Sequence, residues 1–286
     1  MSIMPAGYLK AVIAERVYAR PGRSGITPMG RRAYIRLIRF EYHVTFIGVV
    51  CGALLFTKAG TAPWYKPLLL LYASFNVLLY GGIYTMNAVA DVASDRRHPL
   101  KRKRPLPSKA IPMKSAVAFS AVFITAGLLS GLVLFNGPVF HIYIAVLALN
   151  VFYTFVAKKV PYLELIINGL THMLRFLMGV LLVGAEAPRL FLLAIFCLAF
   201  GLAGVRRSVE KDVPGWEVRK TLKFYSTRGL IVLELLAFLV ISLLWVTDPS
   251  VPRVFYGVLA AVYIVLVGGA HLSGPVRHFF RFIWTR

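Results

Sequence analysis

Three oxygen-bearing side chains recur at four-residue spacing at the end of an apolar segment of this 286-residue chain: Asn87, Asp91 and Asp95. If a helix continues past Met86, this spacing places all three on one of its faces. Carboxylate and amide oxygens suit Mg²⁺, which keeps several waters and is often shared with substrate phosphates. A diphosphate held in this way leaves more easily, because its developing charge is already neutralised. The spacing therefore predicts a magnesium site for a diphosphate-bearing substrate.

Basic residues follow this triplet closely, with eight Lys and Arg residues from Arg96 to Lys114. They could simply pair with the acids at a solvated helix end. The functional interpretation is favoured, because the acids continue a polar stripe that begins inside the apolar segment with Asn76, Tyr80 and Tyr84. The candidate phosphate-binding residues here are Arg96, Lys101, Arg102 and Arg104.

A second charged segment spans residues 206–228. Arg206 and Arg207 offer donors for phosphate oxygens, since a guanidinium can hold two oxygens together. Glu210 and Asp212 are the acids that we expect to help bind the metal, and the sequence leaves open which of Glu210, Asp212 and Glu217 points inward. The tendency of cytoplasmic loops to be basic also explains single Lys or Arg residues here.

Four polar residues share one face of a later apolar segment at helical spacing: Glu164, Asn168, His172 and Arg175. Ionisable groups at membrane depth usually face a cavity or one another. We expect Arg175 to hold an anionic acceptor such as a lipid phosphate. Tyr153 is a candidate for lining the same cavity. For Glu164, Asn168 and His172, the alternative is a hydrogen-bonded network that only fixes helix packing.

The elements that position these residues are membrane helices. The chain is 58% hydrophobic with a mean hydropathy of +0.72, which excludes a water-soluble fold. About eight apolar segments are long enough to cross a bilayer. They are residues 41–56, 67–86, 114–135, 139–157, 161–183, 188–205, 229–246 and 252–272.

The distribution of charge predicts the topology. With the amino terminus inside, 28 of the 33 Lys and Arg residues fall on one side of the membrane, which predicts cytoplasmic termini and cytoplasmic loops at 87–113 and 206–228. The net charge of +22 therefore describes one face, suited to anionic lipids or phosphorylated substrates. Nucleic acid is not an expected partner, because the charge lies on membrane-anchored loops. The sequence does not indicate an oligomeric state.

The triplet Asn87-x-x-x-Asp91-x-x-x-Asp95, placed after a second membrane helix, resembles the first aspartate-rich motif of the UbiA superfamily of intramembrane prenyltransferases. The resemblance covers about residues 34–272. It implies an all-α bundle, typically of nine spans, around a central cavity capped by two cytoplasmic loops. It also implies that Mg²⁺ on the aspartates binds the diphosphate of the donor.

Three segments resemble one branch of this superfamily more closely, the decaprenyl-phosphate phosphoribosyltransferases. Residues 95–105 are similar to its D-R-x-H-P-x-K-R-x-R-P string, 174–179 to its L-R-x-x-x-G signature and 204–210 to its G-K-R-x-x-E segment. The implied reaction moves a phosphoribosyl group from phosphoribosyl diphosphate to a polyprenyl phosphate. Three features depart from the family. The second aspartate motif is degenerate, residues 36–43 lack the R-P-x-x-W-x-K-N string, and a ninth span is absent or reduced to a stub.

Two other functions stay open. A prenyltransferase would move a polyprenyl group from a prenyl diphosphate to an aromatic or glyceryl acceptor, and would need an apolar tunnel for its donor. A ribosyl donor would need polar contacts instead. A transporter or lipid-binding protein would use the polar stripe as a permeation path. We expect an interfacial segment at residues 1–40, a catalytic membrane domain at 41–272 and a basic tail at 273–286.

Overall fold

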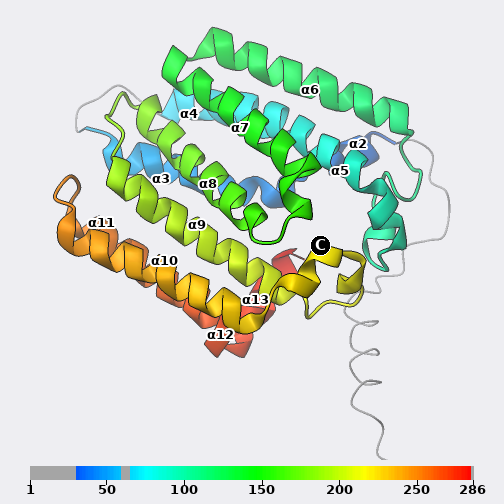
Figure 1. Ribbon diagram of the computed structural model, residues 1–286. Coiled ribbons are helices and arrows are strands. Elements are labelled where there is room, and N and C mark those ends of the chain that lie inside the picture. The colour runs from blue at the N-terminus through cyan, green and yellow to red at the C-terminus, as the bar shows by residue number, and fades with distance from the viewer. Residues whose placement is uncertain (1–29, 59–64, 285–286) are drawn as a thin grey trace, which may run out of the picture.

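The structure is a computed structural model that describes residues 30–58 and 65–284 (Figure 1). Every regular element in these ranges is a helix, as predicted. Eight helical spans are long and apolar enough to cross a membrane, which confirms the predicted number. The chain is an integral membrane protein. Most of the predicted amino-terminal segment, residues 1–29, lies outside the described residues.

The first two spans and the last are built from several helical pieces. The first contains α2 (Arg31–Ile38), η1 (Phe40–Phe46) and α3 (Ile47–Phe56), and the second contains α4 (Tyr65–Leu71), the π-helical η2 (Tyr72–Leu79) and α5 (Tyr80–Arg97). The middle spans are α6 (Met113–Leu134), α7 (Gly137–Phe155) with η4 (Ala157–Lys159), α8 (Leu163–Leu182), α9 (Arg189–Glu210) and α10 (Thr227–Thr247). The last contains α11 (Arg253–Tyr263), η7 (Ile264–Gly268) and α12 (Gly269–Leu272), and α13 (Gly274–Trp284) follows it.

Helix α8 is central and packs against α3, α7 and α9. Glycines let it approach α3 closely: a Cβ on Gly52 would lie 2.2 Å from the carbonyl oxygen of Phe176, and one on Gly179 would lie 2.0 Å from that of Val49. Small residues allow such contacts between membrane helices, whose association gains little from the hydrophobic effect. The contact fixes Arg175 of α8 beside the first span.

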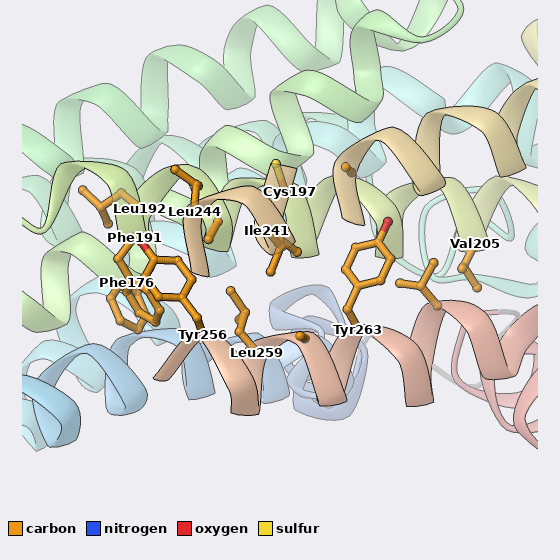
Figure 2. Close-up of a cluster of buried hydrophobic side chains, with 14 of the residues drawn as sticks. Phe176, Phe191, Leu192, Cys197, Val205, Ile241, Leu244, Tyr256, Leu259 and Tyr263 are labelled. Atoms are coloured by element: carbon orange, nitrogen blue, oxygen red, sulfur yellow. The ribbon is translucent and has the colours of Figure 1, made fainter. Parts of the chain in front are cut away.

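On the other side of α8, buried apolar side chains join it to α9, α10 and α11 (Figure 2). Phe176, Phe191 and Tyr256 pack edge to face in this cluster, with Leu244 and Leu259 near them. Such aromatic pairs add to the stabilisation that burial gives. Asn168, Thr171, His172 and Arg175 of α8 line a cavity that α5 and α7 also border, whereas Glu164 pairs with Arg207 of α9.

Two long connections lie at the same end of the bundle: the first loop, residues 98–112, and the second loop, residues 211–226 (Figure 1). Helix α5 extends eleven residues past Met86, so the continuation that the triplet requires is present. Helix α9 also extends further than predicted, to Glu210. Arg206, Arg207 and Glu210 therefore lie on its last turns and not in a loop.

The expected basic tail forms α13, an amphipathic helix of 11 residues. A bilayer crossing needs about 20 residues, so α13 is too short to be a ninth span. Instead it packs against α12 and α9.

Candidate active site

A cavity of about 610 Å³ opens between the first span, α5, α7, α8 and α9, at the end of the bundle that carries the two long loops. Most of the residues that line it have polar or charged side chains, although the carbon atoms of these side chains form about half of its surface. Ala90, Ile167 and Val218 are the aliphatic residues that line it, within the described chain. Nine Lys or Arg side chains line it against three Asp or Glu side chains. The cavity is therefore strongly cationic.

The predicted triplet lines this cavity along one face of α5. Each of its members has a partner on another segment. Arg104 of the first loop lies 3.0 Å from Asp95, Lys158 of η4 pairs with Asp91, and the Thr154 hydroxyl of α7 donates to Asn87 Oδ1. The acids are thus held in place by cations from other elements.

These oxygens fit a magnesium ion that is shared with a ligand. Within the described residues, no group of three or more His, Cys, Asp or Glu side chains could cage a metal alone. Two carboxylates and an amide on one wall, facing a cationic cavity, are the donors expected where substrate phosphates complete the coordination of Mg²⁺. Asp91 and Asp95 are the residues that would hold the ion.

Across the cavity, Glu210 and Arg206 line it from α9. Glu210 connects both loops, because Lys101 of the first and Arg219 of the second each have a nitrogen 3.7 Å from its carboxylate. Burial, then the neighbouring Arg104, lowers the pKa of Lys101, while Glu210 opposes this shift.

Arg207, predicted to hold a phosphate, has a different role. Its side chain is 1% exposed, pairs with Glu164 at 2.9 Å and also pairs with Glu210. Arg219 and Tyr225 also bind the Glu164 carboxylate, the latter with an O–O distance of 2.7 Å. Burial and the Glu164 carboxylate raise the pKa of Tyr225, so this phenol stays protonated as a donor. The group ties α8, α9 and the second loop together behind the cavity wall.

The predicted network along α8 therefore does not form through the Glu164 side chain. Asn168 Nδ2 instead donates to the backbone carbonyl of Glu164, at 2.7 Å. His172 lines the cavity.

Three other predicted site residues lie away from the cavity. Asp212 binds Arg277 at 2.7 Å and Arg281 at 3.3 Å, both on α13, so it anchors that helix. Arg96 and Arg102 are exposed and do not line the cavity. Of the three acids in the second charged segment, Glu210, Asp212 and Glu217, Glu210 is the one that lines the cavity.

Arg175 lies at the opposite end of the cavity from the loops and is 3% exposed. Its guanidinium carbon lies 4.0 Å from the centre of the Tyr80 ring, its Nε donates to the Tyr80 hydroxyl at 3.3 Å and its Nη1 donates to Thr45. Tyr153 lines the cavity from α7, as predicted. The deep end thus holds one fixed cation without an acidic partner among the described residues.

Several cavity cations were not singled out from the sequence. Arg39 adopts a left-handed backbone conformation, φ 57°, at the junction of α2 and η1, and this turn brings its side chain to the cavity. Lys158 and Lys159 of η4 line it as well. No spacing pattern marks these residues. Within the described chain, five lining cations have no acidic partner: Arg39, Lys159, Arg175, Arg206 and Lys220.

His98 shapes the first loop. Its Nδ1 accepts hydrogen bonds from the backbone N–H groups of Leu100, at 3.2 Å, and Lys101, at 3.4 Å. Burial and the nearby Lys101 lower the pKa of His98 to about 4, so the imidazole is neutral and can accept these bonds. This turn directs Lys101 toward Glu210.

Curated relatives match about half of the chain. It is similar to the decaprenyl-phosphate phosphoribosyltransferase of Corynebacterium glutamicum, at 28% identity over 54% of this chain and 48% of the relative. The nodulation protein NoeC of Azorhizobium caulinodans is 32% identical over 50% of this chain and 46% of that protein. The chain spans about half the length of the curated relatives it matches.

Solved structures and a family profile match far more of the chain. A UbiA homolog from Archaeoglobus fulgidus bound to GPP and Mg²⁺ superposes with a TM-score of 0.69 at 19% identity, over 88% of this chain and 95% of that one. The apo UbiA homolog from Aeropyrum pernix K1 gives 0.63 at 19% identity, over 87% and 93%. These likenesses show the fold. The profile of the UbiA prenyltransferase family matches residues 45–282, so the chain belongs to that family.

Proposed function

We propose that this protein is a Mg²⁺-dependent transferase that takes a hydrophilic, phosphate-rich donor, phosphoribosyl diphosphate, and transfers its phosphoribosyl group to a polyprenyl phosphate. The observation that supports the proposal is the excess of cationic side chains in the cavity wall, five of which have no acidic partner among the described residues. A prenyl chain would have to lie against unpaired polar groups there, which costs free energy for each group that loses water. A phosphorylated sugar would instead satisfy them.

The acceptor phosphate is assigned to Arg175. A buried guanidinium that already donates to Thr45 and Tyr80 is held in one orientation and retains further donors. Hydrogen bonds between Arg and phosphate are among the stronger ones in proteins. The lipid tail would extend from this deep end into the bilayer.

The donor's diphosphate is assigned to the cavity mouth. Bound Mg²⁺ on Asp91 and Asp95 would supply charge neutralisation for the leaving group. Lys101, Arg104 and Arg206 would bind the diphosphate oxygens. The bond between the anomeric carbon and the diphosphate oxygen breaks, the electron pair leaves with the diphosphate, and an oxygen of the acceptor phosphate forms the new bond to carbon. The termini and both loops would face the cytoplasm, where such donors are available.

Prenyl transfer is the second candidate, because the related fold from Archaeoglobus fulgidus is described bound to GPP and to DMAPP. The test uses purified full-length protein in lipid nanodiscs with Mg²⁺. One reaction contains radiolabelled phosphoribosyl diphosphate and polyprenyl phosphate, and another contains a labelled prenyl diphosphate with an aromatic or glyceryl acceptor. The proposal expects label in the lipid extract of the first reaction. Label only in the second would reject it.

A further inference from the structure

The cavity is lined by two further neutral amide side chains, which differ in chemistry from its many charged groups. Asn150 of α7 and Asn168 of α8 line it. Asn150 Nδ2 donates to the backbone carbonyl of Val146 at 2.8 Å, and Asn168 Nδ2 donates to that of Glu164 at 2.7 Å. A carbonyl can only accept, so the amide orientation is fixed by its partner in both cases. The Oδ1 atoms remain as acceptors, and no described residue donates to either.

Each amide therefore offers one acceptor, Oδ1, and one remaining donor, the second Nδ2–H. Phosphate oxygens are acceptors, so they can use only the remaining N–H and leave the Oδ1 atoms without a donor. A hydrocarbon chain would leave both oxygens unsatisfied, at a cost of about 1–3 kcal/mol each. A group that carries O–H donors satisfies them. The hydroxyls of a sugar are such donors.

The position of these residues matches the proposed order of groups along the cavity. At 1.5 Å per residue, Asn168 lies roughly 6 Å along α8 from Glu164, near the loops, and roughly 10 Å from Arg175, at the deep end. Asn150 is one turn from Thr154, whose hydroxyl contacts both Asn87 Oδ1 and the backbone carbonyl of Asn150. The amides thus lie between the sites assigned to the diphosphate and to the acceptor phosphate.

We propose that Asn150 and Asn168 form a hydroxyl-binding subsite that recognises the sugar of the donor. This inference rests on the proposed function and adds the feature that would distinguish a glycosyl donor from a prenyl donor in this fold. Tyr153 and His172 also line the cavity, and their side chains form no hydrogen bond with the described residues, so they are available to the same sugar.

The test compares ligands that share a diphosphate and differ in hydroxyls. Binding to the full chain in nanodiscs with Mg²⁺ is measured by calorimetry for phosphoribosyl diphosphate, for its analogues lacking the 2- or 3-hydroxyl and for inorganic pyrophosphate. Asn168→Leu and Asn150→Leu are expected to weaken phosphoribosyl diphosphate binding about tenfold, the equivalent of roughly 1.4 kcal/mol, and to leave pyrophosphate binding within twofold. At least one deoxy analogue should bind wild type about tenfold more weakly, and the matching variant should lose this difference.

Thr171→Val is the matched control, because Thr171 lines the same wall but its hydroxyl already donates to the backbone carbonyl of Asn168 at 2.8 Å. It should bind both ligands like wild type. The subsite would be overturned if both Asn variants weakened pyrophosphate binding as much as phosphoribosyl diphosphate binding, or if both retained full phosphoribosyl diphosphate binding. Either result would leave the proposed function intact. Transfer from a prenyl diphosphate alone would overturn both. Using two Asn variants on different helices keeps the test valid if one fails to fold.

Discussion

Glu164 and Arg207 form an ion pair of 2.9 Å in which the side chains are 0% and 1% exposed. It joins α8 to α9 directly behind the cavity wall. Removing one partner of a buried pair leaves an uncompensated charge, whereas the intact pair contributes little net stability. The pair therefore fixes the relative position of two helices that carry site residues.

Arg207→Met should destabilise the protein by about 3 kcal/mol, the lower end of the range for such pairs, because Arg219 and Tyr225 still bind Glu164. The midpoint of thermal unfolding in detergent measures the effect. Arg206→Met is the control, since Arg206 lines the cavity and has no acidic partner among the described residues. A similar loss in both variants would contradict the assignment.

Asp91→Asn and Asp95→Asn should each reduce turnover at least about 100-fold, because the leaving group loses its charge neutralisation.

Asp212→Asn tests the reassignment of the second charged segment. Since Asp212 binds Arg277 and Arg281 of α13, this change should preserve turnover and lower the unfolding midpoint. Steady-state rates at saturating Mg²⁺ separate the two outcomes. If Asp212→Asn lost turnover with an unchanged unfolding midpoint, Asp212 would belong to the active site after all.

Lys158 pairs with Asp91, so it would compete with a metal ion for that carboxylate. Binding of Mg²⁺ alone should be weak in wild type and should tighten severalfold in Lys158→Met, because Asp91 is released. The same variant should bind pyrophosphate more weakly, because a cavity cation is lost. Calorimetry with each ligand alone measures both effects.

Lys159→Met is the matched control for this coupling. Its side chain lines the cavity without an acidic partner in the described chain. It should lower pyrophosphate affinity and leave Mg²⁺ affinity unchanged. If Mg²⁺ binds Lys158→Met no more tightly than wild type, the Lys158–Asp91 pair does not control access to the metal site.

Arg175→Met should raise the KM for polyprenyl phosphate about tenfold or more, since a charge-assisted hydrogen bond contributes roughly 1.5–3 kcal/mol. The KM for the diphosphate donor should change little, because that group is assigned to the other end of the cavity. Initial rates with each substrate varied in turn provide the measurement. A larger effect on the donor would place the acceptor elsewhere.

The parts of the site that the sequence predicts lie within single helices. Asn87, Asp91 and Asp95 follow a four-residue spacing, which determines their common face once α5 continues past Met86. Hydropathy predicts the eight spans, and the family resemblance predicts the cavity.

Pairings between distant segments could not be predicted, because local spacing carries no information about them. Arg206 and Arg207 show why. They are neighbours in sequence, yet successive residues on a helix point about 100° apart at 3.6 residues per turn. Once α9 extends to Glu210, Arg206 faces the cavity and Arg207 is buried against Glu164. Asp212 likewise finds its partners 65 or more residues away, on α13.

The most direct measurement is an experimental structure of the protein with Mg²⁺ and phosphoribosyl diphosphate. We expect diphosphate density between two pairs of residues, Asp91 and Asp95 on α5 and Lys101 and Arg206 opposite, with both acids on the metal and the sugar against Asn168. Diphosphate density elsewhere, with Asp91 still bound to Lys158 and Asp95 still bound to Arg104, would contradict it.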